Sequence, residues 1–477
     1  MPRRAWLLAL GAIAVRAAAS FTVAVIQSDG TRDLRMAELI EAGRFTEALL
    51  VGVPPPPPLH PLLTALVDVA IGNRTAAGIA VSVILGGLAV IPLYWIARRT
   101  WDDRVATVAA ALYSLLPAVV DFQIEPITEG AFMFFFLAAM AVGWSALEER
   151  SWERTVAAAG CAALAWLTRP EGIYLLPLFA AAALFRFSRF SLVAVPVFVA
   201  TWLVLAYPYL SFIHAHTGRW QPSLSPIPGM ILDTLTGARA PGTAVQDFEE
   251  YREVRKHGIL LGGAVLLGAN FFGKALFYVL GLFLLLGLYR PTPAEGRRSL
   301  LAYQLLAAFG YLVPIALSFV ASTPFSHRFL LLPATLLLPV IAVGLVRAAE
   351  WTRRPQALPI LAGALCLAMA VRDFRPRRAD KLGMKEAGLA ILKSIGPGKR
   401  VFATHGQVEF YAQSAWVPLP ETVTIQDLEA AKLDAFAFGP SDPKLEERIR
   451  ERHRFLGEFP SPPRKDVLPV RVYLATP

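Results

Sequence analysis

The sequence predicts a polytopic α-helical membrane protein that ends in a small α/β domain. The 477 residues are 55% hydrophobic and only 17% charged. Apolar segments of about 20 residues, the length that crosses the core of a bilayer, recur along most of the chain. From about residue 380 the composition changes to that of a soluble domain. We therefore expect a transmembrane domain over residues 1–375 and an α/β domain over residues 380–477.

The first apolar segment begins after Arg3 and Arg4. It imitates a signal peptide, because small residues follow Arg16 as they do at a cleavage site. The apolar character continues from Phe21 to Ile26, so we expect one uncleaved membrane helix. Arg16 would then lie within the membrane, where it either faces a polar interior or extends to the interface.

A polar stretch, residues 28–60, follows this helix. Within it, residues 34–42 have the spacing of a short helix lying on the membrane, and Pro54–Pro58 predict a stiff extended segment. Residues 62–71 are too short to span and predict a re-entrant or interfacial piece. About eleven crossings are expected, the first helix and ten more near residues 75–97, 105–120, 127–147, 155–168, 172–185, 190–212, 259–289, 300–320, 329–346 and 357–371.

Arginines cluster in alternate loops, which the positive-inside rule assigns to the cytoplasm. The N-terminus is then cytoplasmic, while loops 28–60 and 213–258 and the C-terminal domain lie outside a plasma membrane. Four arginines directly after the last span, within residues 372–378, oppose this orientation, but five loops favour it. The cytoplasmic set contains Arg98, Arg99, Arg104, Arg150, Arg154, Arg186, Arg189, Arg290, Arg297, Arg298, Arg347, Arg353 and Arg354.

The C-terminal region alternates helical and strand patterns, as a small α/β domain does. It carries no Gly-rich phosphate loop and no cluster with metal-ligand spacing, so an accessory role is expected. The predicted helices cover residues 384–394, 427–432 and 443–453, and the predicted strands cover residues 400–403, 435–438 and 470–474.

The net charge of +10 does not indicate a nucleic-acid partner, because most arginines lie in short loops where they contact anionic lipid headgroups. Membrane lipids are the expected partners. Cys161 and Cys366 fall inside apolar spans and are expected to pack as small residues. His60, His214 and His216 lack ligand-like spacing, so no zinc site is expected from them.

Asp29 is the strongest catalytic candidate. It follows the first apolar segment at the expected boundary between water and lipid, where partial burial raises the pKa of a carboxylate toward that of a general base. A structural alternative remains, because Ser28 and Asp29 are residue types that cap helix N-termini.

Other charged residues flank spans on the same predicted face. Glu129 opens an apolar span and either pairs with an arginine or metal or stabilises the helix dipole. Arg169 lies in a short connection, as a site residue or as part of a charged surface turn. Arg328 follows His327 and either binds a phosphate through its planar guanidinium or anchors a helix at the interface. Such a set suits transfer from a phosphate-linked substrate, in which a base activates a hydroxyl and cations stabilise the departing phosphate.

These motifs together resemble the GT-C glycosyltransferases that use polyprenyl-phosphate sugars, a superfamily that includes the protein O-mannosyltransferases and the lipid A aminoarabinose transferase. The resemblance covers about residues 5–350. It rests on the order of Ser28-Asp29, Leu34-Arg35-Met36-Ala37, Ala42-Gly43, Pro57-Pro58-Leu59-His60-Pro61, Thr128-Glu129, Leu167-Thr168-Arg169-Pro170-Glu171-Gly172, and His327-Arg328-Phe329 with Pro333.

The resemblance implies a GT-C-like fold and an inverting transfer of a sugar from a polyprenyl-phosphate carrier to an acceptor hydroxyl outside the cell. Asp29 matches the family's catalytic aspartate, Glu129 an acidic position that opens a later helix, and Arg328 the cation near the lipid phosphate. Asp33 stands where the family often has an aromatic residue, so its part in catalysis or acceptor binding is open. We also expect Arg169, His327 and His60 to bind substrate.

The resemblance leaves the sugar and the acceptor undefined, and a divalent cation is the one candidate cofactor. Two other functions compete with transfer. One is a transporter or flippase of lipid-linked substrates, against which the sequence shows no two-fold internal repeat. The other is an inactive family member that acts as a partner subunit, against which the intact Asp29 and Glu129 argue.

Overall fold

The chain forms two compact units in a computed structural model. The first unit comprises residues 1–16, 82–124 and 128–373, and the second comprises residues 17–81, 125–127 and 374–477. The boundary expected near residue 380 stays a prediction. The structure describes residues 2–51, 56–218, 220, 270, 272–289, 293, 296–320, 327–417, 419, 423–439, 443–460 and 469–475.

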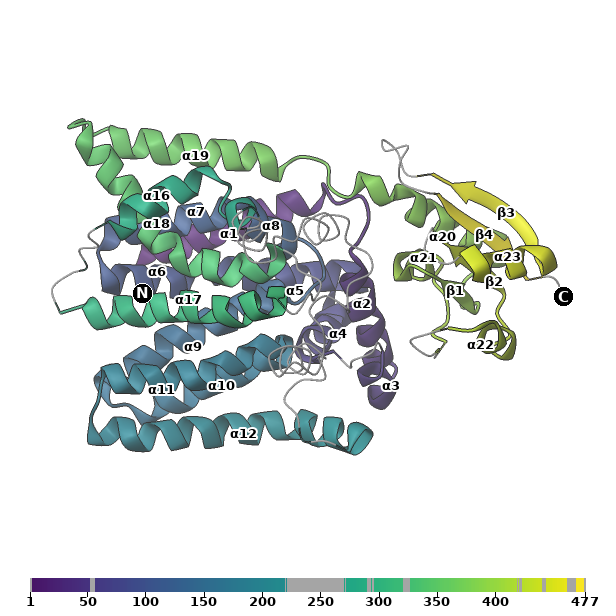
Figure 1. Cartoon of the computed structure of the whole chain (residues 1–477), viewed down its shortest axis with the longest axis horizontal. Coiled ribbons are helices and arrows are strands. Elements are labelled where there is room, and N and C mark those ends of the chain that lie inside the picture. The colour runs from purple at the N-terminus through teal and green to yellow at the C-terminus, as the bar shows by residue number, and fades with distance from the viewer. Residues whose placement is uncertain are drawn as a thin grey trace. The chain divides into compact units, whose positions relative to one another are not determined.

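The first unit is helical, and its helices lie side by side (Figure 1). Local sequence sets their ends: the side chains of Asp102, Ser151 and Ser188 each cap a helix by accepting a backbone N–H. Two helices lie partly in this unit, since residues 17–20 of α1 (Arg3–Ser20) and 74–81 of α5 (Arg74–Leu88) belong to the second unit. The other helices are α6 (Val90–Thr100), α7 (Asp103–Leu115), α8 (Pro117–Gln123), α9 (Glu129–Glu149), α10 (Trp152–Thr168), η1 (Pro170–Tyr174), α11 (Leu175–Phe185), α12 (Arg189–Thr217), α16 (Val279–Leu288), α17 (Arg298–Val320), η2 (His327–Leu330), α18 (Leu331–Trp351) and α19 (Ala357–Asp373).

The prediction of a polytopic helical membrane protein is confirmed. Among the described residues, four helical segments are long and apolar enough to cross a membrane, and the pair α7 and α8, bent by 55°, is a candidate fifth. Shorter apolar helices accompany them, so the expected number of eleven crossings stays a prediction. The four segments are Arg74–Thr100, Glu129–Glu149, Arg189–His216 and Arg328–Trp351.

Two predicted features fall partly outside the described residues. Loop 213–258 begins inside α12, which runs on to Thr217, and residues 221–258 are outside. Of the predicted span 259–289, the described part contains α16. Pro54 and Pro55 of the proline segment are also outside.

Arg16 faces a polar interior and does not extend to the interface. Its side chain is fully buried, and its Nε donates to the side-chain oxygen of Gln123 at 2.8 Å. Nη1 and Nη2 of Arg16 donate to the backbone carbonyls of Ser114 and Tyr113, respectively. Buried polar groups require such partners, so Arg16 serves to join α1 to α7 and α8.

Loops that were assigned to the cytoplasmic side meet at one end of the helices in the first unit. Glu148, at the end of α9, pairs with Arg99 in the last turn of α6, with Arg186 just after α11 and with Arg297 just before α17. Arg104 pairs with Glu350 at the end of α18. The pairs agree with the predicted grouping of loops, while the side of the membrane stays a prediction.

The second unit contains a four-stranded sheet in the order β1-β2-β4-β3 (Figure 1). β1 (Val401–Ala403) is parallel to β2 (Ala435–Phe438), whereas β4 (Val470–Leu474) is antiparallel to β2 and to β3 (Arg454–Phe459). The three predicted strands and three predicted helices are present. The predicted helices are α20 (Leu382–Ile395), α22 (Ile425–Ala430) and α23 (Pro443–Arg452), and α21 (Gly406–Tyr411) is a fourth helix that was not predicted.

Helices cover both faces of this sheet. On one face, Ile391 of α20 and Val408 of α21 pack against Val401 and Ala437. On the other, helices α22 and α23 contribute Leu428 and Ile449 to a cluster with the strand residues Phe402, Phe436 and Phe438. The alternation along each strand directs neighbouring side chains to opposite faces, and this produces three layers.

The polar stretch after α1 folds as part of this second unit. It forms α2 (Ser28–Glu41), α3 (Phe45–Leu49) and α4 (Leu59–Ile71). α1 ends at Ser20, six residues before the expected end, and α2 begins six residues before the predicted helix 34–42. The C-terminal part holds this stretch, because Arg377 and the segment Thr22–Ala24 exchange backbone hydrogen bonds of 2.9 and 3.0 Å.

Candidate functional site

Asp29 lies in the first turn of α2, at a helix N-terminus that the C-terminal part of the chain holds in place. Its side chain is 29% exposed, and its Oδ1 lies 3.7 Å from Nη1 of Arg32. The alternative in which Ser28 or Asp29 caps the helix is wrong, because Gln27 occupies the N-cap position and makes no side-chain capping bond. Asp29 is therefore a partly accessible carboxylate beside the positive end of a helix dipole.

Three residues fix the start of α2. Glu125 accepts the backbone N–H of Gln27 at 2.7 Å and the Nε–H of Arg378 at 2.7 Å. Arg378 also donates to the side-chain oxygen of Gln27 at 2.7 Å, which closes a triangle. Only 1% of the Glu125 side chain is exposed. Burial raises the pKa of Glu125, and the adjacent Arg378 opposes that rise.

Two further contacts to the C-terminal part support α2. The N–H of Ile26 donates to the hydroxyl of Tyr411 at 3.1 Å, and Arg35 donates to the carbonyl of Ser414. The sequence offered no motif for Tyr411 or Ser414. Arg378 was visible only as one of the arginines that opposed the predicted orientation. In the structure, Arg378 pairs with the buried Glu125.

Asp33 and His60 form a buried pair between α2 and α4. The exposed fraction is 3% for Asp33 and 0% for His60, and Nδ1 of His60 lies 3.4 Å from Oδ2 of Asp33. Arg32 donates to the other oxygen of Asp33 at 3.3 Å. The pair orients α2 on α4, while a part for either residue in substrate binding stays a prediction.

In the first unit, Glu129 collects two arginines that are far apart in the sequence. It is the first residue of α9, and its side chain is 4% exposed. Its Oε1 accepts Nη1–H of Arg169 at 2.6 Å and the Nε–H of Arg328. Its Oε2 is buried and accepts no hydrogen bond from a described residue. Helix-dipole stabilisation and pairing with arginine, the two alternatives for Glu129, thus both hold.

Arg169 occupies a tight turn but does not belong to a surface charge cluster. Its side chain is 12% exposed, and its Nη2 and Nε donate to the two carboxylate oxygens of Glu171 at 2.7 and 3.3 Å. The turn requires Gly172, because a Cβ there would collide with the backbone of Ala165 and Trp166. Arg169 is therefore held in a fixed orientation by two carboxylates.

Arg328 is likewise mostly enclosed, since 15% of its side chain is exposed. Its guanidinium lies 5.9 Å from the ring centroid of Phe122. This enclosure does not fit a simple interfacial anchor. His327 begins η2, and its side chain lies outside the described part of the structure.

The described residues contain no group of three His, Cys, Asp or Glu side chains that could hold a metal ion. The second unit presents Asp29, and the first unit presents Arg169 and Arg328 around Glu129.

Comparison with known proteins identifies the fold. Residues 55–212, less than half of the chain, match the family model described as dolichyl-phosphate-mannose-protein mannosyltransferase. No curated protein gives a significant match. Among solved structures, ArnT from Cupriavidus metallidurans bound to undecaprenyl phosphate is similar with a TM-score of 0.62 at 13% identity, and all of both chains is covered.

An oligosaccharyltransferase from Archaeoglobus fulgidus is similar too. Its apo form has a TM-score of 0.56 at 14% identity and covers 91% of this chain and 69% of its own. Its complex with an inhibitory peptide and a dolichol-phosphate has a TM-score of 0.54 at 12% identity, with 95% and 72% covered. The GT-C resemblance predicted from the motifs is confirmed at the level of the fold.

Proposed function

We propose that this chain, which has the GT-C fold, is an inverting glycosyltransferase that moves a sugar from a polyprenyl-phosphate carrier to an acceptor hydroxyl on the extracytoplasmic face. The observation that carries the proposal is the convergence of Arg169 and Arg328 on the buried Glu129. It occurs in a chain whose fold is shared with an enzyme solved with undecaprenyl phosphate bound. Guanidinium groups in an enclosed site suit a lipid-linked phosphate.

Asp29 is the proposed general base. The acceptor oxygen attacks the anomeric carbon while Asp29 takes the hydroxyl proton. The bond between the anomeric carbon and the phosphate oxygen breaks, and its electron pair leaves with polyprenyl phosphate. A single displacement of this kind inverts the anomeric configuration. Partial exposure of Asp29 leaves it accessible to an acceptor, and the fixed start of α2 limits its movement.

Arg328 is the proposed phosphate-binding cation, and Glu129 is a positioning residue. Negative charge develops on the phosphate oxygen as the bond to the sugar breaks, and a fixed guanidinium stabilises that charge without reorganising. Glu129 orients Arg328 through Nε, and Glu171 orients Arg169 through two donors. Carboxylates already fix both arginines before a donor arrives, which is the preorganisation that such catalysis requires.

The test is a transfer assay on the full chain in detergent. Polyprenyl-phosphate sugars extracted from cells that lack the protein serve as donors, and release of free polyprenyl phosphate is the readout. Detergent removes the two compartments that transport needs, so a transporter would leave the donor intact. The anomeric configuration of the product, determined by NMR, tests inversion separately.

Asp29→Asn is the decisive variant, because asparagine keeps the size of the side chain and cannot take the proton. We expect turnover to fall by about 10²–10⁴-fold with donor retention unchanged. Glu38→Gln is the matched control, since Glu38 lies on the same helix, is 43% exposed and pairs with Arg35. Retention of more than about a tenth of turnover in Asp29→Asn, below the low end of the expected effect, would show that Asp29 is not the base.

A further inference from the structure

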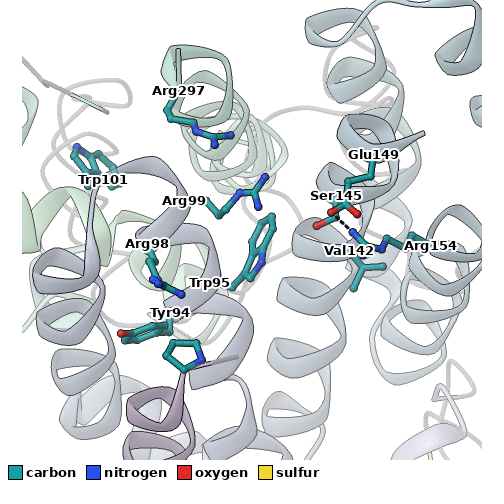
Figure 2. Close-up of a pocket in the computed structure, with 11 residues that line it drawn as sticks. Tyr94, Trp95, Arg98, Arg99, Trp101, Val142, Ser145, Glu149, Arg154 and Arg297 are labelled. Atoms are coloured by element: carbon teal, nitrogen blue, oxygen red, sulfur yellow. Dashed lines mark ion pairs between the residues drawn. The ribbon is translucent and has the colours of Figure 1, made fainter. Parts of the chain in front are cut away.

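A large pocket opens at the end of the first unit that carries the convergent arginine loops. It has a volume of about 840 Å³. Figure 2 shows Trp95 and Arg99 of α6 facing Ser145 and Glu149 of α9 across it, and Arg98 of α6 lies beside Tyr94. Its remaining lining comes from Pro2, Tyr94, Trp101, Val142, Arg154 and Arg297.

This pocket is separate from the arginine cluster around Glu129. Glu129 and Glu149 begin and end the same 21-residue helix. At a rise of 1.5 Å per residue, such a helix places its ends about 30 Å apart. A group bound in the pocket therefore lies near the opposite end of α9 from Arg169 and Arg328.

The pocket and its surroundings carry an excess of positive charge. Glu148 is shared by Arg99, Arg186 and Arg297, one carboxylate among three guanidinium groups. Asp103 is shared by Arg4 and Arg98, at 2.9 and 3.2 Å. Arg154 pairs with Glu149. Within the described residues, these ion pairs leave the arginines in excess over the carboxylates, so an anion would complete the charge balance.

Aromatic residues give the pocket the character of a membrane interface. Tyr94, Trp95 and Trp101 line it, and the guanidinium of Arg99 lies 5.1 Å from the ring centroid of Trp95. Tryptophan and tyrosine concentrate where lipid headgroups meet the hydrocarbon region. The four lining arginines have exposed fractions from 32% for Arg99 to 52% for Arg98, so a headgroup can reach them.

We propose that this pocket binds the phosphate of an anionic phospholipid headgroup from the adjacent leaflet. Basic pockets between membrane helices on the cytoplasmic side suit such headgroups, and bidentate arginine matches phosphate geometry. A free phosphate offers the same chemistry without an acyl chain. The aromatic lining favours the lipid, because it gives the glycerol and upper acyl region an apolar surface.

The test is equilibrium binding to the purified full chain in a neutral detergent, followed by native mass spectrometry. The probes are dioctanoyl phosphatidylglycerol, dioctanoyl phosphatidylcholine and inorganic phosphate. We expect phosphatidylglycerol to bind most tightly. Equal affinity for phosphatidylcholine would overturn the role of net charge. Equal affinity for inorganic phosphate would overturn the lipid assignment and identify a soluble anion as the occupant.

Two variants locate the site. Arg98→Gln leaves Asp103 with Arg4 and is expected to fold, and it should weaken phosphatidylglycerol binding about fivefold. Arg99→Gln combined with Arg297→Gln should weaken it roughly 30-fold. The control is Arg353→Gln with Arg354→Gln, which removes equal charge from exposed positions just beyond α18. If the control weakens binding as much as the double pocket variant does, the lipid responds to general surface charge and the proposed site is wrong.

Discussion

Replacing Arg378 with methionine removes the cation that neutralises Glu125 at the start of α2. The side chain of Glu125 is 1% exposed, so the carboxylate would remain buried, and the N–H of Gln27 would be its remaining donor among the described residues. Breaking a buried ion pair from one side typically costs about 3–5 kcal/mol. Arg378 also holds a left-handed backbone conformation with φ of 57°, which residues with a Cβ rarely adopt without compensating contacts.

The opposite change, Glu125→Gln, is expected to cost less. It leaves Arg378, whose side chain is 22% exposed and can be hydrated. We expect about 1–3 kcal/mol, the cost of leaving one polar group without its partner. In the double variant neither charge remains, so the two costs should not add. The double variant should lose less stability than the sum of the two single variants, because it no longer leaves the buried Glu125 carboxylate without its cation.

Hydrogen exchange of residues 22–31 measures the effect on the start of α2. A loss of about 3 kcal/mol corresponds to roughly 150-fold faster local exchange, since each 1.4 kcal/mol is tenfold. Turnover of Arg378→Met in the transfer assay should also fall, because Asp29 lies on the turn that the substitution loosens. Arg375→Met is the control, an exposed arginine three residues earlier. Unchanged exchange in Arg378→Met, or equal effects in Arg375→Met, would refute the claim that this ion pair positions Asp29.

Two further changes test the first unit. Gly172→Ala should destabilise the protein by several kcal/mol, because the added methyl group collides with the backbone at Ala165 and Trp166. Thermal unfolding in detergent measures this loss. Gly160→Ala is the control and should have little effect, because a Cβ has room there. Glu129→Gln should weaken the hold on Arg169 and Arg328 and lower kcat/KM for the polyprenyl-phosphate donor about tenfold or more. An unchanged kcat/KM would contradict the positioning role of Glu129.

The helical fold class could be predicted because lipid imposes apolar runs of fixed length, and such runs are visible in any single sequence. Among the site residues, Glu129 and Arg328 were recognised from their places at the ends of spans. Their mutual contact could not be predicted, since 199 residues separate them. The same holds for Glu125 and Arg378, which are 253 residues apart.

Local sequence patterns did not predict the elements whose positions are set by contacts with distant parts of the chain. Residues 28–33 are too polar to indicate a helix, yet α2 begins at Ser28 because Glu125 and Tyr411 fix the backbone just before it. β3 was missed because none of the residues Arg454–Phe459 is fully buried, three of the six are exposed, and Arg454 and Glu458 are charged. Such an edge strand is stabilised by pairing with β4 and has little apolar signal of its own.

Glu409 of α21 provides a pH-dependent test of how α21 packs beside β1. Burial raises its pKa from about 4.5 to about 7, while the N–H of Ala403, which donates to it at 3.0 Å, and the charge of Arg35 oppose the rise. The folded state therefore prefers the protonated carboxyl. Above pH 4.5 the unfolded chain ionises first, so this region loses stability as the pH rises toward 7 and stays at the lower value above it.

The loss is roughly 3 kcal/mol at most, at 1.36 kcal/mol for each unit of pKa shift. Glu409→Gln keeps an oxygen for the N–H of Ala403 and cannot ionise, so it should remove this part of the pH dependence. Exchange of residues 400–412 at pH 5 and 8, corrected for intrinsic rates, measures it. Burial and Lys381 lower the pKa of His405, so its contribution to stability rises with pH, opposite to that of Glu409. His405 is present in both the wild type and Glu409→Gln, so its contribution cancels when the two are compared. Glu386→Gln, at an exposed position on α20, should follow the wild type. If Glu409→Gln also follows the wild type between pH 5 and 8, the carboxyl of Glu409 is already hydrated, and α21 does not bury it as the structure indicates.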